Sequence, residues 1–374
     1  MDSTAVFSRL RPEAVPRPHH RLPRCLARSI EASHAMATAG LPPACATVCS
    51  PRLSVLSALV LALGMLAPAG PAAGAPLAAA DETAQYAVSQ HGAVGPEPVA
   101  ARHHGGLYRI SGRGGVAYLF GTIHVGDRSF YPLAPEAERA LAEADHVVVE
   151  LDPRGERAFR HALARHGRYP DGDDIGRHVS ADTLVRLRAA LHAEGVSLAS
   201  MAQSKPWLIA NLLLSIQLDR EGFRRSEGVE QRLLAQAERH GARIVPLESA
   251  ELQLGLFDSM SEVEAERYLR DTLAGLADGS TLQRARRTIE AWRTGDTAAL
   301  ASLLADATAG NSETAEFTRR KLLGRRNAEM AAQIDTLLEQ GGVFFVGVGL
   351  LHLLGDDGLP QLLAQRGYLI ERVY

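Results

Sequence analysis

The clearest strand signals in the chain are short apolar runs that begin at residue 107. Two β-favouring runs, 107–111 and 116–120, flank Gly112-Arg113-Gly114-Gly115, and this pattern predicts a β-hairpin. The run His146–Glu150 contains three consecutive valines. An apolar run without alternation is typical of a strand that is covered on both faces of its sheet. Three more strands are expected at 243–247, 343–349 and 368–374.

The stretches between these runs carry helical periodicity. Pro135–Ala144 has apolar side chains on one face and a proline at its start, and Ser180 is expected to cap a helix that ends at Gly195. Further helices are expected at Trp207–Leu218 and Val229–His240, and from Ser261 to about Glu339 with breaks near Gly279, Gly295 and Gly310. Strands at both ends with a long helical insertion between them predict an α/β fold with a mixed β-sheet. Pro246 places its strand nearer an edge than the centre of that sheet.

The first 80 residues differ from the rest, because they are rich in Ala, Pro and Arg and contain only three acidic side chains. This composition is typical of a poorly ordered extension. Within it, Arg52 precedes the uncharged apolar run 53–66 and small-residue sites follow, which predicts a secretory signal. A spanning helix needs about 20 apolar residues, and the run 53–66 is shorter than that. We therefore expect cleavage and a periplasmic or secreted product with no membrane attachment. A retained inner-membrane anchor is the alternative. A linker, 81–104, would lead into one domain, 105–374.

Composition excludes several classes of protein. The three cysteines, Cys25, Cys45 and Cys49, precede the expected cleavage site, so the mature chain would have no cysteine nucleophile, Cys-ligated zinc or disulfide. From Asp81 onward the formal net charge is −7, because the first 80 residues hold seven of the 40 basic and three of the 43 acidic side chains. The mature chain shows no basic face or aromatic platform, so nucleic acid is not an expected partner.

Several catalytic signatures are missing from the sequence. The run Gly347-Val-Gly-Leu-Leu-His352 lacks the third glycine of a dinucleotide fingerprint, and no nucleotide cofactor is expected. There is no Gly-x-Ser-x-Gly elbow, no His-Glu-x-x-His motif and no Walker loop. Serine hydrolases, zincins and nucleoside triphosphatases therefore have no support.

Four side chains with acid–base or ligand chemistry follow predicted strands. His124 and His352 each follow a strand by a Gly-x-x step, and Glu150 and Glu248 each close a strand. Ligands of open α/β sheets bind beyond the carboxyl ends of the strands, so these groups should converge if the strands are mostly parallel. Considered alone, either histidine would be interpreted as a structural residue held by hydrogen bonds. Glu150 alone would be interpreted as the ion-pair partner of an arginine. The duplicated placement of the two histidines favours a shared site.

Histidine and glutamate together suit a hydrolytic metal. A neutral imidazole binds a metal or acts as a general base, and a hydrolytic metal takes N and O ligands and keeps an open position for water. We therefore expect a divalent ion, Mn, Co or Zn, held by His124, His352 and either Glu150 or Glu248. A metal-free site, in which glutamate and histidine activate water directly, fits the same residues.

These motifs, in this order, resemble the TraB/GumN family over about residues 105–374. The resemblance is carried by Gly121-Thr-Ile-His124 after a strand, Val147-Val-Val-Glu150, Gly228-Val-Glu-Gln, Arg326-Asn327 and Val346-Gly-Val-Gly-Leu-Leu-His352-Leu-Leu-Gly355. The family is related to the TIKI metalloproteases and more distantly to erythromycin esterase-like proteins, which implies two related α/β halves that share a mixed sheet around a cleft. In the TIKI branch the two Gly-x-x-His histidines and the first-half glutamate are needed for metal-dependent peptide cleavage. The resemblance therefore implies these roles for His124, His352 and Glu150.

The resemblance also implies roles for three further residues. Arg326-Asn327 matches an Arg-Asn pair of the family, and Arg326 would hold a substrate carboxylate or oxyanion. Asn327 and Glu230 are the other expected substrate-binding residues, although the family often has Asp at the position of Glu230.

The expected function is an exported hydrolase that cleaves a peptide or ester bond in a peptide or small-molecule substrate. Its catalytic residues would be His124, Glu150, His352 and Arg326. The alternative is a non-catalytic binding or regulatory protein of the same family, acting in cell-surface signalling or polysaccharide export.

Overall fold

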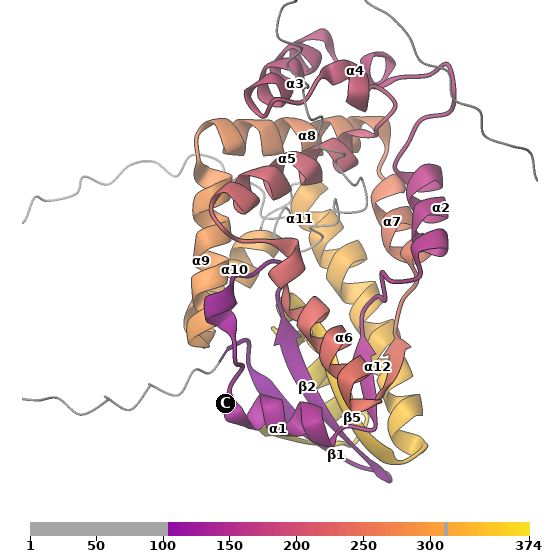
Figure 1. Cartoon of the computed structure of the whole chain (residues 1–374), viewed down its shortest axis with the longest axis vertical. Coiled ribbons are helices and arrows are strands. Elements are labelled where there is room, and N and C mark those ends of the chain that lie inside the picture. Colours follow the sequence, from indigo (N-terminus) through magenta and orange to yellow (C-terminus); the bar gives the residue numbers. More distant parts are fainter. Residues whose placement is uncertain (1–103, 310–312) are drawn as a thin grey trace, which may run out of the picture. The chain divides into compact units, whose positions relative to one another are not determined.

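A computed structural model describes residues 104–309 and 313–374 (Figure 1). The predicted signal run 53–66, the three cysteines and positions 81–103 of the predicted linker lie outside the described residues. One six-stranded sheet is present in the described part. Its strands are β1 Leu107–Gly112, β2 Gly115–Thr122, β3 His146–Val149, β4 Arg243–Pro246, β5 Gly342–Gly349 and β6 Leu369–Arg372.

The sheet is mixed, which confirms the sequence-based prediction. Its strand order is β4-β3-β5-β2-β1-β6. The pairs β2–β5, β5–β3 and β3–β4 are parallel, whereas β1 is antiparallel to both β2 and β6. The predicted hairpin is therefore present as β1–β2, and β4 with Pro246 lies at an edge. Four neighbouring parallel strands end at the same side of the sheet, which is the condition for their strand-end residues to meet.

Most of the other described residues lie in helices. They are α1 Pro135–Glu143, α2 Glu156–His166, α3 Ala181–Ala193, α4 Leu198–Met201, α5 Pro206–Arg220, α6 Val229–His240, α7 Ala250–Asp258, α8 Glu262–Ala277, α9 Ser280–Thr294, α10 Thr297–Thr308, α11 Glu313–Phe317, α12 Arg325–Glu339 and α13 Leu359–Gln365. A π-helical segment, Thr318–Gly324, joins α11 to α12, and short 3-10 turns lie at Arg128–Phe130, Ile175–Arg177, Arg225–Glu227 and Leu350–Leu353.

Local sequence sets the helix ends. The Ser180 side chain accepts a hydrogen bond from the Thr183 N–H and caps α3, as predicted. Helix α6 ends at Gly241, whose φ of 72° lies in the left-handed region that favours glycine. Helix α9 lies between Gly279 and Gly295, both left-handed, which confirms two of the expected helix breaks.

Both faces of the central strands are covered. Val147 and Val149 of β3 pack in one apolar cluster with α1 and α6, whereas Val148 packs in another with α12 and α13. In β5, Phe345 joins the first cluster and Phe344 the second. This alternation confirms the prediction, from the run of three valines, of a strand covered on both faces.

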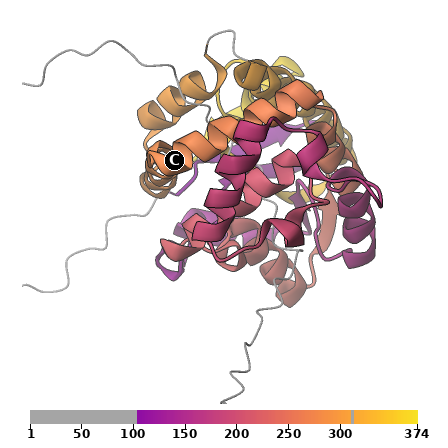
Figure 2. The ribbon, with the colours of Figure 1, turned by 90° about the horizontal axis from the view of Figure 1, so that it is seen from above.

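The helical insertion has an apolar core of its own. Side chains of α2, α3, α5, α7 and α8 form a third cluster around Trp207 and Phe257. Seen from above, α3 and α8 lie in front of the strands (Figure 2). No helix of the described residues is long and apolar enough to span a membrane.

Candidate functional site

The four predicted strand-end residues lie at one side of the sheet. His124 follows β2, Glu150 follows β3 directly, and Glu248 follows β4. His352 lies in the 3-10 turn that continues β5. Because β2, β5, β3 and β4 run parallel, these segments all leave the sheet in the same direction.

Gly349 marks the point where three of these side chains meet. A Cβ placed on Gly349 would lie 2.9 Å from Glu150 Oε1, 3.7 Å from His352 Cδ2 and 3.9 Å from His124 Nε2. The Gly349 N–H donates to Glu150 Oε1 at 2.5 Å. The absence of a side chain at Gly349 therefore leaves room for two imidazoles and one carboxylate around one point.

A buried arginine joins the two strand-end glutamates. Arg326, in the first turn of α12, donates from Nη2 to Glu150 Oε2 at 2.7 Å and to Glu248 Oε2 at 2.8 Å. Its Nε donates to Glu248 Oε1 at 2.8 Å. Gln253 of α7 donates to the same two carboxylates, at 2.8 Å to Glu248 and 3.3 Å to Glu150. The arginine and both glutamates are at most 9% exposed, so each charge depends on its partners for stabilisation.

The orientation of His352 is fixed by an amide. Asn327 donates from Nδ2 to the Asp357 carbonyl at 2.7 Å, so its Oδ1 faces His352 Nδ1 at 2.5 Å and accepts a hydrogen bond from it. The proton of the neutral ring is therefore on Nδ1, and Nε2 carries a lone pair. That Nε2 lies 3.5 Å from Glu150 Oε1.

The protonation states of this pair follow from burial and charge. Burial disfavours the charged form of Glu150, but His352, Arg326, His124 and the Gly349 N–H together lower its pKa to about 2. Burial, together with the positive charge of Arg326, lowers the pKa of His352 to about 3. At neutral pH, a carboxylate and an imidazole lone pair face each other, and two acceptors in this arrangement attract a cation or a shared proton.

His124 has its own carboxylate partner. Its Nδ1 lies 2.8 Å from Glu230 Oε1, which also accepts a hydrogen bond from the Thr122 hydroxyl at 2.5 Å. Burial disfavours the charged imidazole, but the charge and hydrogen bond of Glu230 raise the pKa of His124 above its ordinary value. Since Nδ1 faces Glu230, Nε2 is the nitrogen that remains for chemistry.

We expect a Glu230→Gln substitution to lower the pKa of His124, because it removes the charge that raises it. A group with a raised folded-state pKa contributes stability below its unfolded pKa of about 6.5 and loses it as the pH rises through the folded value. The loss of stability in this variant should therefore be larger at pH 6 than at pH 9. NMR titration of the His124 ring and denaturant unfolding at both pH values would measure these effects. Glu238→Gln, on the exposed side of α6, is the control and should leave the His124 titration unchanged.

A second arginine lies beside His124 and was not singled out from the sequence. Arg225 begins the 3-10 turn before α6, and its charge acts on both His124 and Glu230. Its Nη1 atom is buried and has no hydrogen-bond partner among the described residues. Burial lowers the pKa of its guanidinium to about 10, which the Glu230 carboxylate offsets only in part, so it remains charged at neutral pH.

Four further predicted residues have hydrogen-bond partners within the chain, and their predicted roles toward substrate or metal stay predictions. Arg326 donates to two glutamates and to the Leu322 carbonyl, and these bonds hold Glu150 in place. The Glu248 carboxylate accepts hydrogen bonds from Arg326 through both oxygens, and its role as an ion ligand stays a prediction. Asn327 and Glu230, expected to bind substrate, orient His352 and His124 respectively.

The remaining donors fit a divalent ion in their chemistry. Two imidazoles and one carboxylate are a common N/O set for zinc and related ions. In metal sites a ligating histidine is usually held through its other ring nitrogen, as Asn327 and Glu230 hold these two rings. Within the described ranges, however, no three His, Cys, Asp or Glu side chains are already arranged as a metal site.

Comparison with known proteins decides the family. The TraB/PrgY/gumN family matches residues 106–372, which include the whole sheet and every residue of the site above. The chain belongs to this family. The resemblance drawn from the motifs is thus confirmed.

Two relatives of this TraB/PrgY/gumN family protein are similarly distant. Both are described as "Uncharacterized protein YbaP", one from Shigella flexneri and one from Escherichia coli strain K12. Each is 24% identical to this chain, over 252 residues for the first and 251 for the second. Each alignment covers 66% of this chain and 87% of the relative. Among solved structures there is no match. The more remote relationships to TIKI metalloproteases and erythromycin esterase-like proteins stay predictions.

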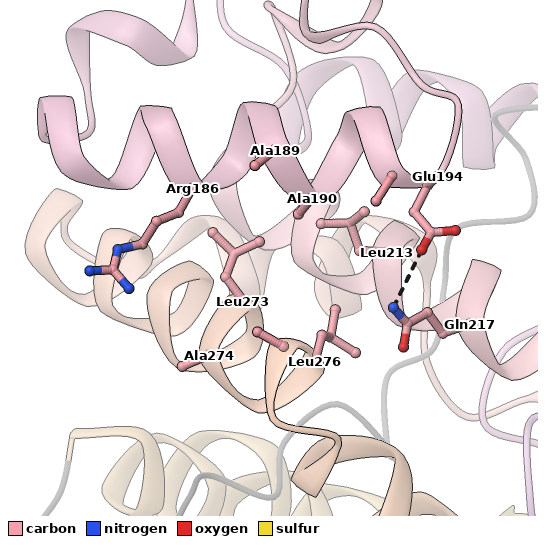
Figure 3. A pocket seen from close by; sticks show the side chains of 11 residues that line it. Arg186, Ala189, Ala190, Glu194, Leu213, Gln217, Leu273, Ala274 and Leu276 are labelled. Carbon is pink, nitrogen blue, oxygen red and sulfur yellow. Dashed lines mark hydrogen bonds between the residues drawn. The ribbon is translucent and has the colours of Figure 1, made fainter.

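A separate hollow of about 350 Å³ lies among α3, α5 and α8 (Figure 3). Its walls are mostly alanine and leucine side chains. Gln217 donates a hydrogen bond of 3.3 Å to Glu194, which also pairs with Arg220 at 2.8 Å. None of the site residues named above lines this hollow, so it has no part in the chemistry of the strand ends.

Proposed function

We propose that this TraB/PrgY/gumN family protein is an exported hydrolase that cleaves a peptide or ester bond where His124, Glu150 and His352 meet. The observation that carries the proposal is the pair of facing acceptors, His352 Nε2 and Glu150 Oε1, 3.5 Å apart. Burying a carboxylate opposite a lone pair is costly unless a cation or proton is shared between them. Such an arrangement is typical of functional sites, where pKa values are shifted far from their ordinary range.

The residues around the pair support this proposal. Arg326 and Gln253 keep Glu150 ionised and fixed, and Asn327 keeps the lone pair of His352 turned toward it. A divalent ion held by His124, His352 and Glu150 would bring the pKa of a bound water toward ~7. In the metal-free form of the site, the proton-transfer group is His124.

His124 has the properties of a general acid–base. The Glu230 carboxylate raises the pKa of His124, fixes its tautomer and stabilises the imidazolium. In the metal-free form of the proposal, Nε2 takes a proton from the attacking water and returns it to the leaving group. A general acid–base alternates between its neutral and its protonated form, and the Glu230 carboxylate stabilises the protonated form of His124.

The test compares wild type with His352→Gln on mixed peptides and p-nitrophenyl esters, after chelator treatment and with Mn, Co or Zn added. We expect hydrolysis by wild type and a loss of about 100-fold or more in the variant. His178→Gln is the matched control, because His178 is held by Asp173 and Glu262 in the helical insertion. Isothermal titration with each metal on both proteins separates the metal-dependent form from the metal-free form.

Three outcomes distinguish the readings. Activity only with added metal, and metal binding lost in His352→Gln, supports the metal-dependent form, whereas full activity after chelation supports direct activation by His124. A folded wild type without hydrolysis under any condition would contradict the proposal and favour the binding or regulatory alternative.

A further inference from the structure

The segment that carries Arg225 is hydrogen-bonded to the loop that carries His124. Gly126 and Arg224 exchange backbone hydrogen bonds of 3.0 and 2.7 Å. The Val229 N–H donates at 3.0 Å to the carbonyl of the residue before His124. These bonds fix Arg225 beside the catalytic histidine of the proposed hydrolase.

The guanidinium of Arg225 lacks a fixed counter-ion. Its Nη1 is buried without a hydrogen-bond partner, and no side-chain ion pair of Arg225 is found in the described part of the chain. Glu230, the acidic group whose charge acts on Arg225, is already bound by His124 Nδ1 and the Thr122 hydroxyl. Arg225 thus keeps a full positive charge and an unused donor next to the site.

Arg225 and Arg326 differ in how their guanidinium charges are paired. The charge of Arg326 is paired with two glutamates, which accept from its Nε and Nη2 atoms. A buried donor without an acceptor costs stability, and a buried charge without a partner costs more. A ligand anion relieves that cost, and the planar fork of an arginine matches a carboxylate with two parallel hydrogen bonds.

We propose that Arg225 binds a carboxylate of the substrate, so that the site selects peptides with a free carboxylate close to the bond beside His124. The location of the reacting bond in this inference rests on the proposed function. The choice of a carboxylate as the ligand rests on the Nη1 donor that has no hydrogen-bond partner. A permanent anion suits this position, because the guanidinium is fully charged before any reaction begins.

The test uses two peptide mixtures that differ only in the C-terminal group. Both are N-acetylated tripeptides of random sequence without Asp or Glu, one with a free carboxylate and one with a C-terminal amide. Binding to the full chain is measured by the ligand-induced rise in melting temperature and by isothermal titration, which need no turnover. We expect wild type to bind the carboxylate mixture about ten- to hundredfold more tightly, as for a hydrogen bond to a charged group. Arg225→Gln should bind both mixtures alike.

Arg224→Gln is the matched control. Arg224 is the neighbouring arginine, 62% exposed in its side chain and 3.5 Å from Asp219, so its substitution should keep the carboxylate preference. The unliganded Arg225→Gln variant should melt at or above the temperature of wild type, because it loses an unpartnered charge. A lower melting temperature would make Arg225 a structural residue and overturn the inference.

Binding and hydrolysis are scored separately, so the two proposals can fail independently. Carboxylate-selective binding that depends on Arg225, without hydrolysis, supports the inference and contradicts the proposed hydrolase. Hydrolysis of both mixtures at equal rates, or no carboxylate preference in wild type, overturns the inference and leaves the hydrolase in place. An effect of Arg225→Gln on kcat alone, regardless of the C-terminal group, would assign Arg225 to the reacting bond and also overturn it.

Discussion

Replacing Arg326 by methionine is expected to lower the free energy of unfolding by about 3–5 kcal/mol at pH 7. The substitution leaves Glu150 and Glu248 as two buried carboxylates that repel each other, with only Gln253 as a shared donor. Breaking a buried ion pair from one side costs far more than the pair contributes, because the remaining charges stay desolvated. Urea unfolding followed by circular dichroism would measure the loss.

The adjacent arginine provides the matched control. Arg325 is 75% exposed in its side chain and pairs with Glu329 one helical turn away at 2.9 Å. Such surface pairs contribute about 0–1 kcal/mol, so Arg325→Met should change the unfolding free energy by less than about 1 kcal/mol. If the two substitutions had equal effects, the buried cluster would not carry the stability assigned to it.

The pH dependence gives a second check on the same variant. The pKa of Glu150 in the wild type is lowered to about 2, so its stabilising contribution is present above the unfolded pKa of about 4.5 and is lost as the pH falls toward 2. Without Arg326 the carboxylates protonate more readily. The difference in stability between wild type and Arg326→Met should therefore narrow between pH 4.5 and pH 2.

Much of the fold could be predicted because it depends on local signals. The Gly-rich turn before β2, the three valines of β3 and the glycine that ends α6 each act through their immediate neighbours. The order of strands in the sheet could not be read in this way. It places β5, near the end of the chain, between β3 and β2, and such pairing depends on packing between distant segments.

In the candidate site, too, some residues could be predicted from local sequence and others could not. His124 and His352 could be found because each follows a strand by the same Gly-x-x step, and parallel strands bring such positions together. The partners of these residues could not be found. Gln253 reads as one polar position in an ordinary helix, and Arg225 as one more arginine in a chain rich in arginine. Their roles come from contacts between segments far apart in sequence, as in the 176 positions between Glu150 and Arg326.

The second large effect is expected for Glu150→Gln, which should reduce hydrolysis by about 10²- to 10⁴-fold. The amide has a single acceptor oxygen, but both oxygens of Glu150 accept hydrogen bonds, from the Gly349 N–H and from Arg326. In either orientation, the NH₂ group of the amide would therefore face a donor, either the Gly349 N–H or Arg326. An NH₂ group at the Oε1 position would also donate to His352 Nε2 and occupy the lone pair that the proposed reaction uses.

The Glu248→Gln variant separates the effect of Glu150→Gln on hydrolysis from its effect on the stability of the buried ion-pair cluster. Glu248 shares Arg326 and Gln253 with Glu150, so both substitutions weaken the same ion-pair cluster. Only Glu150 faces His352, however, and Glu248→Gln should retain hydrolysis within about tenfold of wild type once unfolded protein is accounted for. The comparison requires kcat/KM and the unfolding free energy of both variants. If activity fell in parallel with stability in both, Glu150 would be only a structural partner of Arg326, and the facing acceptors would have no part in the reaction.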